Sequence, residues 1–431
     1  MFKEQKKEFM ELVELSQKLE LLDVLNLPEL KSNEYVSNDR KLIDFNEEIR
    51  TAWLEKVGRL HASYDKSPYE GEIPKDAFGR SIGYTYEALL DDKLLKNNYS
   101  YDITDYNSST FLYPNGMASI KGTIDAISVL LDEEIDIQFD LEYFESNIYL
   151  NTLSKTERLR RGPNKSNIFI FEPINYDFYG SLVKSDDLIN AINNSSAKLK
   201  FVIVDSTMHN KTEILEQLSK KIKDYKDTVF VDVRSGLKFD EDGLELSNLG
   251  IAEWFVHKSQ ESFFNKLEKI LKNYRNITGA NLSYISYVSL LYTHSIYDSI
   301  NYSHGVFNTV KEFMDITGNL NFKNSKIKSS KGDFMGIKIY SPFLFFTMNI
   351  SEEKECMDFI HRIQAYLSKE GYFLPLRNSW GFRFPSIEPI THYKTREIAI
   401  KLYLGKYRGS LFDELIDLFK KISSQGDTGI F

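Results

Sequence analysis

Three consecutive segments decide the fold: KLKFVIVDSTMHN (198–210), TEILEQLSKKIKDY (212–225) and DTVFVDVRSG (227–236). The first and third have the pattern of buried strands that end in polar residues, and the second has the pattern of an amphipathic helix. In an open α/β sheet, ligands bind beyond the carboxyl ends of the strands. Five polar residues at these two strand ends are therefore candidates to share a site: Asp205, Thr207, His209, Asp232 and Arg234.

The same alternation extends along the middle of the chain and predicts a mainly parallel sheet. Strand patterns alternate with helix patterns over residues 76–304, which is typical of a sheet covered by helices on both faces. Residues 1–75 predict an N-terminal helical arm, and residues 305–431 predict a smaller α+β C-terminal domain. The expected fold class is therefore α/β, with a large sheet domain and a small domain.

Composition limits the classes of function. The 431-residue chain has a net charge of −9, which disfavours nonspecific nucleic-acid binding. It has no run of about 18 apolar residues and no signal-peptide core, so we expect a cytoplasmic protein without a membrane partner. Cys356 is the only cysteine, and no two histidines have metal-binding spacing. We therefore expect no disulfide and no metal site, and we expect Cys356 to be a plain core or surface thiol.

Two further segments carry candidate ligand-binding residues. In FLYPNGMASIKGTIDAI (111–127), the Pro-Asn-Gly sequence allows a tight turn, and the following helix begins with unpaired N–H groups that can bind an anion. In DLEYFESNIYL (140–150), two aromatic residues, Tyr143 and Phe144, follow a predicted strand. The alternatives are an ordinary loop-to-helix junction and core aromatics. The candidates for binding phosphate are Asn115, Gly116, Met117 and Ser119.

In their order along the chain, these segments resemble the fold-type I pyridoxal-phosphate enzymes, and most closely their cysteine/methionine-metabolism and aminotransferase group. The resemblance extends from about Tyr84 to Pro389. It implies pyridoxal 5′-phosphate as cofactor, with Asp205 and its neighbours at one strand end beside it, and Tyr143 or Phe144 covering one face of its pyridine ring. It also implies that Asp232 contacts the pyridine nitrogen and keeps the ring protonated. The alternative for Asp232 is a turn or helix-cap carboxylate.

The resemblance also requires a lysine that forms a Schiff base with the cofactor. The segment FVHKSQESFFNK (255–266) departs from the family's histidine-serine-x-threonine-lysine, because the lysine position holds Glu261, and only a shift of three residues supplies Lys258. Lys258 follows an apolar strand, and 258 − 232 = 26 positions separate it from Asp232, enough for one loop and one strand of ~3.3 Å per residue. We expect Lys258 to be the catalytic lysine. The alternatives are Lys238, Lys266 or no lysine at all.

The segment FLPLRNSWGFRFPSI (373–387) is similar to the part of the family that holds the substrate carboxylate. An arginine can hold a carboxylate through two parallel hydrogen bonds. We expect Arg383 to do so, with Arg377 as the second choice. The alternative is that either arginine pairs with a structural acid.

The resemblance implies a homodimeric enzyme that transforms an amino acid through an external aldimine, as a transferase or a lyase. Which amino acid it takes and which bond it breaks stay open. A second hypothesis is a protein of this fold that lacks a working Schiff-base lysine and serves as a binding or regulatory subunit. A third is an unrelated nucleotide-binding α/β protein, against which the missing glycine-rich fingerprints count.

Overall fold

The structure is a computed structural model. It describes residues 1–61, 95, 98–131, 135–155, 160–161, 165–178, 180–209, 213–322, 325–348, 350 and 352–425. Tyr84, where the resemblance begins, and the expected arm boundary at residues 75 and 76 lie outside these described residues. No helix within the described ranges combines the length and the apolar character needed to cross a membrane.

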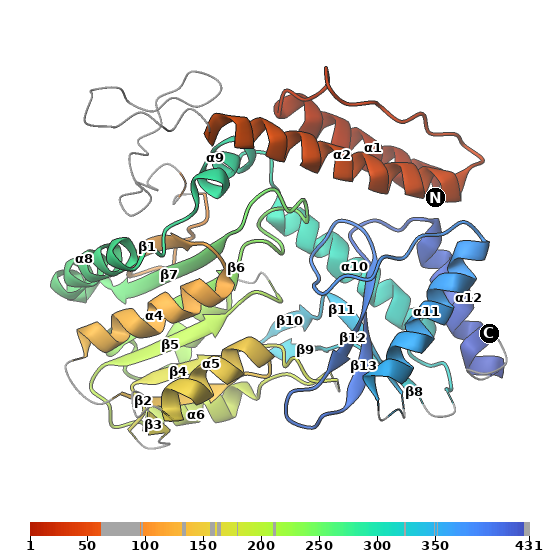
Figure 1. Cartoon of the computed structure of the whole chain (residues 1–431). Coiled ribbons are helices and arrows are strands. Elements are labelled where there is room, and N and C mark those ends of the chain that lie inside the picture. Colours follow the sequence, from red (N-terminus) through yellow and green to blue (C-terminus); the bar gives the residue numbers. More distant parts are fainter. Residues whose placement is uncertain are drawn as a thin grey trace.

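A seven-stranded sheet forms the centre of the large domain (Figure 1). The neighbouring strands follow the order β1-β7-β6-β5-β4-β2-β3. Strands β2 to β6 pair in parallel, whereas β7 runs antiparallel to both β1 and β6. The predicted mainly parallel sheet is therefore confirmed. The strand bounds are β1 (Tyr106–Tyr113), β2 (Asp136–Asp140), β3 (Arg160–Arg161), β4 (Ile168–Phe171), β5 (Lys200–Asp205), β6 (Thr228–Ser235) and β7 (Gly250–His257).

Helices cover both faces of this sheet because its strands are apolar on both sides. On β5, Phe201 and Ile203 belong to the cluster that includes α4 and α8, whereas Val202 and Val204 belong to the cluster that includes α6 and α7. This alternation follows from the two-residue period of a strand. The helix bounds are α4 (Gly116–Leu130), α5 (Phe144–Lys155), α6 (Ser185–Asn194), α7 (Glu213–Lys221) and α8 (Glu261–Thr278).

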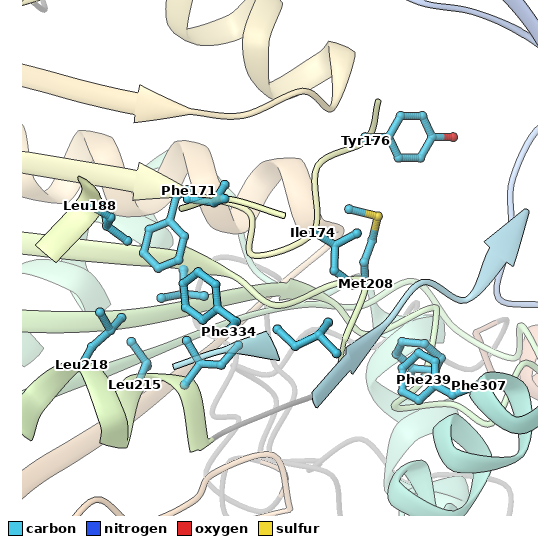
Figure 2. Packing of buried hydrophobic residues seen from close by; sticks show 14 of the residues in the cluster. Phe171, Ile174, Tyr176, Leu188, Met208, Leu215, Leu218, Phe239, Phe307 and Phe334 are labelled. Carbon is cyan, nitrogen blue, oxygen red and sulfur yellow. The ribbon is translucent and has the colours of Figure 1, made fainter. Parts of the chain in front are cut away.

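The small domain is built on a four-stranded antiparallel sheet of order β12-β13-β11-β8. The large and small domains share one hydrophobic cluster, in which Phe334 of the β9–β10 hairpin stacks on Phe171 at the end of β4 with ring centroids 6.0 Å apart (Figure 2). Cys356 is fully buried on α11, which confirms a core thiol. The bounds are β8 (Ser325–Lys328), β9 (Lys331–Phe334), β10 (Ile337–Tyr340), β11 (Phe343–Met348), α11 (Glu353–Lys369), β12 (Ser386–Thr391), β13 (Ile398–Tyr403) and α12 (Ser410–Gln425).

The N-terminal helices α1 (Phe2–Lys18) and α2 (Tyr35–His61) pack on their own chain. The Trp53 indole donates a hydrogen bond of 3.2 Å to the Ser289 hydroxyl on α9 (Tyr284–Thr293), and α2 also contacts α12. Figure 1 shows the two helices lying across the top of both domains. The expected domain boundary at residues 304 and 305 falls inside the long helix α10 (Ser299–Thr317).

Candidate functional site

A cavity of about 800 Å³ lies between the large domain and the small domain. On one side it is lined by the start of α4 and by residues that follow β2, β4, β5 and β6. On the other side it is lined by the loop before β12 and by side chains of β12 and β13. This is the side beyond the carboxyl ends of the parallel strands, at which the sequence predicted a crevice.

The start of α4 supplies an anion-binding turn to this cavity. Asn115 caps the helix by accepting a hydrogen bond of 2.8 Å from the Ala118 N–H, and Asn115, Gly116 and Met117 line the cavity. A Cβ on Gly116 would lie 3.0 Å from the Ser235 Cβ, so a larger residue there would push the turn and β6 slightly apart. The first N–H groups of a helix have no partner within the helix and attract anions.

Ser119 does not line the cavity. Its side chain is fully buried, and its hydroxyl donates a hydrogen bond of 2.7 Å to the Gly116 carbonyl. The hydroxyl therefore shapes the first turn of α4 and does not face a ligand, which corrects the expectation for this residue.

Two carboxyl groups at neighbouring strand ends line the cavity. Asp205 ends β5, and Glu172 directly follows β4. The Asp205 carboxylate accepts a hydrogen bond of 3.0 Å from the Thr207 N–H, and burial raises its pKa to about 6. Burial, and next the charge of Asp205, raise the pKa of Glu172 well above its usual value. Burial therefore disfavours the charged form of both carboxyl groups.

The prediction that Asp232 lies in the crevice is wrong. β6 continues for three residues beyond it to Ser235, and it is Ser235 that lines the cavity. Asp232 is 3% exposed and pairs with Arg234, which also pairs with Asp240. Its carboxylate therefore belongs to a buried ion-pair network inside the domain. His209 is buried and also lies outside the lining of the cavity.

The prediction that Lys258 reaches the crevice is also wrong. β7 runs antiparallel to β6, so Gly250 pairs with Ser235 at the cavity edge, whereas Lys258 follows the opposite end of β7. Eight strand residues separate the two ends, which is roughly 25 Å at about 3.3 Å per residue. Lys258 is exposed in a 3₁₀ turn, and Lys266 is exposed on α8.

Lys238 is the lysine that faces the cavity from the large domain. Its ammonium donates a hydrogen bond of 3.0 Å to the Trp380 carbonyl, bonds the Ser379 hydroxyl, and lies 5.3 Å from the Trp380 ring centroid. Gly381 has a φ of +91°, and the lack of a side chain there lets the loop that contains Trp380 pack closely against the aliphatic part of Lys238. Burial, together with the charge of Lys401, lowers the pKa of Lys238 to about 8.

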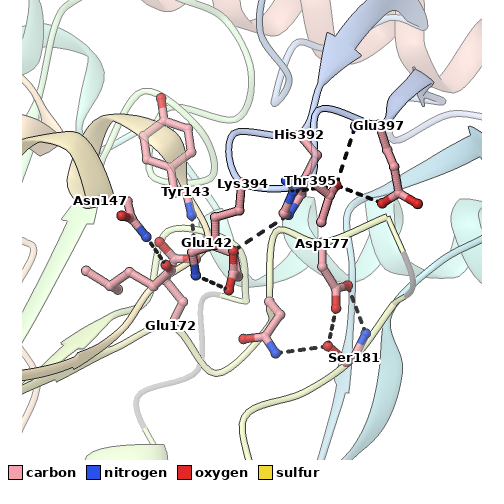
Figure 3. A network of polar contacts seen from close by, with 12 residues as sticks. Glu142, Tyr143, Asn147, Glu172, Asp177, Ser181, His392, Lys394, Thr395 and Glu397 are labelled. Carbon is pink, nitrogen blue, oxygen red and sulfur yellow. Dashed lines mark hydrogen bonds and ion pairs between the residues drawn. The ribbon is translucent and has the colours of Figure 1, made fainter. Parts of the chain in front are cut away.

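Aromatic rings line the cavity close to these groups, and a polar network borders it. Tyr143 and Phe144 both line the cavity, and the Tyr143 ring meets the Tyr176 ring edge to face with centroids 5.7 Å apart. The Tyr143 N–H donates a hydrogen bond of 3.3 Å to Glu172 (Figure 3). Next to it, Glu142 pairs with Lys394 of the small domain at 2.6 Å, so this network links the two domains.

Neither arginine that was expected to bind a carboxylate lines the cavity. Arg383 is 5% exposed and is paired with Glu8 and Glu11 of α1. Arg377 pairs with two other carboxylates, those of Glu47 at 2.7 Å and Glu245 at 3.1 Å. The alternative of structural ion pairs therefore describes both arginines.

Sequence reasoning missed a second lysine in the cavity. Lys401 on β13 lines it, is buried, and pairs with Glu388 on β12. Its ammonium also donates a hydrogen bond of 2.9 Å to the Tyr176 hydroxyl. The signal was present in IAIKLY (398–403), where one lysine interrupts a strand that is otherwise apolar.

The residues of the cavity fit pyridoxal phosphate. The turn at Asn115 suits a phosphate, the Asp205 carboxylate suits a protonated ring nitrogen, and the Lys238 amine suits an aldehyde. All three belong to the lining of one cavity. Among the described lining residues, only Lys238 and Lys401 carry positive charge.

No family model and no curated protein matches this chain. Solved structures do match. The chain is similar to a cystathionine gamma synthase from Xanthomonas oryzae pv. oryzae in complex with aminoacrylate and cysteine, with a TM-score of 0.54 and 13% identity over 83% of this chain and 91% of that chain. It is also similar to a cysteine desulfurase from Thermococcus onnurineus, with a TM-score of 0.51 and 8% identity over 86% of this chain and 90% of that one.

A third similar structure is described as an O-acetylhomoserine (thiol)-lyase from Campylobacter jejuni and holds a pyridoxyl-lysine monophosphate. Its TM-score is 0.52 at 12% identity, over 79% of this chain and 88% of that chain. At such identities the likeness establishes the fold. The chain has the architecture of the fold-type I pyridoxal-phosphate enzymes, as the sequence resemblance predicted.

Proposed function

We propose that this protein is a pyridoxal-phosphate-dependent enzyme that transforms an amino acid, as a transferase or a lyase. One observation carries the proposal: an amine with a lowered pKa, an anion-binding helix start and a strand-end carboxylate line the same cavity. These are Lys238, the turn at Asn115 and Asp205. Lys238 takes the role that the sequence had given to Lys258.

Each of these groups has a separate task. The N–H groups of Gly116 and Met117 would hold the phosphate, and the Asp205 carboxylate would keep a proton on the ring nitrogen. Tyr143 would cover one face of the ring. When bound, pyridoxal phosphate supplies a sink for the electrons that are released when a bond at the substrate's α-carbon breaks.

Lys238 would hold the cofactor and transfer protons. Its neutral amine would bind the cofactor's aldehyde carbon, with water as the leaving group. The same amine would serve as the base that takes a proton from the substrate's α-carbon and, once protonated, as the acid that returns it. A pKa of about 8 suits both tasks, because the amine and the ammonium are both populated near neutral pH.

The proposal includes a homodimer, which rests on the family resemblance, and a cytoplasmic location, which rests on the sequence analysis alone. The alternative of a lysine-less binding subunit was motivated by the altered segment around Lys258. Lys238 supplies an amine to the cavity, so the altered segment around Lys258 no longer supports a lysine-less subunit.

Absorption spectroscopy tests the proposal. The purified protein is titrated with pyridoxal phosphate and, as a matched control, with pyridoxal, which lacks the phosphate. We expect a visible band that saturates with pyridoxal phosphate at a concentration at least about tenfold lower than with pyridoxal, because the helix start binds the phosphate charge. Subsequent addition of L-cystathionine, L-cysteine or L-methionine should change the band. A protein that forms no band with either aldehyde is not an enzyme of this kind.

A further inference from the structure

A turn of the small domain contacts a loop of the large domain beside the cavity. The turn comprises residues 392–397 and joins β12 to β13. The Lys394 ammonium donates a hydrogen bond of 2.6 Å to Glu142 Oε1, and His392 Nε2 lies 3.6 Å from Glu142 Oε2 (Figure 3). Both oxygens of one large-domain carboxylate therefore face the same turn of the small domain.

Hydrogen bonds within the turn fix the orientation of His392. Its Nδ1 accepts a hydrogen bond of 3.1 Å from the Thr395 N–H, a group that can only donate. A neutral imidazole has one ring N–H, so Nε2 carries the proton on the side that faces Glu142. The His392 ring also meets the Phe178 ring of the large domain edge to face, with centroids 5.4 Å apart. The turn therefore presents a donor to Glu142 in a fixed position.

Glu142 belongs to the same short loop as Tyr143, between β2 and α5. The backbone N–H groups of both residues donate to the buried Glu172 carboxylate. The Leu141 carbonyl accepts a hydrogen bond of 2.7 Å from the Asn147 side chain (Figure 3). The large domain thus holds the backbone of this loop, and the small domain holds its one carboxylate side chain.

The position of the Tyr143 ring depends on this loop. Its hydroxyl donates a hydrogen bond of 3.0 Å to Glu145, and its ring centroid lies 5.2 Å from that of Phe144, so these two partners belong to its own segment. Tyr143 and Phe144 both line the cavity. A shift of the loop backbone would therefore carry the ring with it.

We propose that the turn 392–397 is a latch that holds Tyr143 over the cavity, and that Glu142 is the positioning residue through which it acts. The inference rests on the proposed function, under which Tyr143 covers the ring of the cofactor. The Lys394 side chain is 49% exposed, and ion pairs at the surface are weak and screened by salt. The latch is therefore reversible, and its strength falls as ionic strength rises.

Hydrogen exchange of the full chain without cofactor tests the contact itself. Exchange is followed in a peptide that covers residues 141–150 and in a peptide from β7, which is not part of the latch. Lys394→Met and Glu142→Gln each remove one charge of the pair. Both should speed exchange at residues 141–150 about two- to fivefold, the usual effect of a partly exposed ion pair, and leave β7 unchanged.

Two further variants serve as controls for this measurement. Lys394→Arg keeps the positive charge and should exchange at residues 141–150 as the unaltered protein does. Lys220→Met is the matched control, because Lys220 is also at the surface and pairs with Glu216 at the similar distance of 2.7 Å, but on α7. It should leave exchange at residues 141–150 unchanged.

Release of bound pyridoxal phosphate tests whether the latch acts through Tyr143. The loaded protein is diluted at low and at high salt, and the loss of the visible band is followed. We expect Lys394→Met to speed the loss about two- to fivefold at low salt, and less at high salt, where the pair is already screened. In a Tyr143→Ala protein the same substitution should add nothing, because substitutions that act through one contact are not additive.

The outcomes separate the latch from the proposed function. Unchanged exchange at residues 141–150 in both pair variants, or an equal increase in β7, overturns the latch. An effect of Lys394→Met on release that persists in full in Tyr143→Ala overturns the action through Tyr143. A protein that forms no visible band contradicts the proposed function, and the exchange result, which needs no cofactor, then supports or overturns the contact by itself.

Discussion

The strands of the central sheet end at two opposite sides of the large domain, and at each side a lysine follows an apolar strand. Only one of these lysines reaches the cavity. Lys238 follows β6, which ends at the cavity, whereas Lys258 follows β7, which runs the other way. At the cavity side, Asp205 is buried, Lys238 is partly buried, and the pKa values of both are shifted. At the far edge, Lys258 is exposed to solvent. The direction of a strand thus decides which polar residues meet.

The largest expected effect is the loss of the visible band when Lys238, but not Lys258, is replaced by alanine. Lys238→Ala should abolish the visible band with pyridoxal phosphate, because no other amine at the strand ends lines the described part of the cavity. Lys258→Ala should leave the band and its cofactor affinity unchanged. Spectra after gel filtration check both variants, and circular dichroism confirms their folding. A visible band that persists in Lys238→Ala and is absent in Lys258→Ala would show that Lys258, and not Lys238, binds the aldehyde.

The arginines behind the cavity should matter for stability. Arg383→Met leaves Glu8 buried without its partner, which should cost about 3–5 kcal/mol of unfolding free energy. Arg377→Met, in a partly exposed cluster, should cost under about 1 kcal/mol. Urea unfolding measures both. An Arg383 variant of normal stability but poor amino-acid affinity would return this arginine to the substrate site.

The cost of Arg383→Met should also depend on pH. Burial raises the pKa of Glu8 to about 7 even with Arg383 in place, above the value of an unfolded glutamate. Between the two values the folded chain binds more protons than the unfolded chain, so stability falls as pH rises. The variant should therefore lose less stability at pH 5 than at pH 8.

Asp205 on β5 and Asp232 on β6 should also differ in what their substitution affects. Asp205→Asn removes the carboxylate proposed to hold the ring proton, and we expect amino-acid turnover to fall about ten- to hundredfold, in line with one charge-assisted hydrogen bond. Asp232→Asn removes one partner of the buried Arg234 and should lower stability. Turnover and thermal unfolding are measured for both. Equal turnover in Asp205→Asn and the unaltered protein would exclude the assigned role.

The smallest expected effect is the dependence on pH of the rate at which the visible band forms. The pKa of Lys238 is lowered to about 8, so the neutral amine decreases about tenfold per pH unit below that value. The rate of band formation with pyridoxal phosphate should rise with pH and level off above about 8. Lys401→Met removes a neighbouring positive charge and should move the plateau to higher pH. Stopped-flow absorption from pH 6 to 10 checks this, and a rate that falls over this range would contradict it.

Local patterns were sufficient for the sheet, its covering helices and part of the cavity. The apolar runs of β4, β5 and β6 follow from burial on both faces, and the turn at Asn115 follows from Pro-Asn-Gly before a helix. Asp205 and Tyr143 also line the cavity, as expected for residues next to parallel strands. These features depend on short segments, which a sequence displays directly.

The other features depend on contacts between distant segments. The pairing of Arg383 with Glu8 joins residues 375 positions apart, and Lys401 meets Tyr176 across 225 positions. The direction of β7 depends on how the segment after Lys238 folds back, since an antiparallel and a parallel strand can have the same apolar pattern. For this reason the prediction from the sequence put Lys258 at the cavity side of the sheet, whereas it lies at the opposite side.

Peptide mapping shows directly which lysine binds the aldehyde of pyridoxal phosphate. The protein with bound pyridoxal phosphate is reduced with borohydride, digested and analysed by mass spectrometry for the modified lysine. We expect the label on Lys238, in the peptide that follows β6. A label on Lys258, or on any lysine outside the cavity, would contradict it.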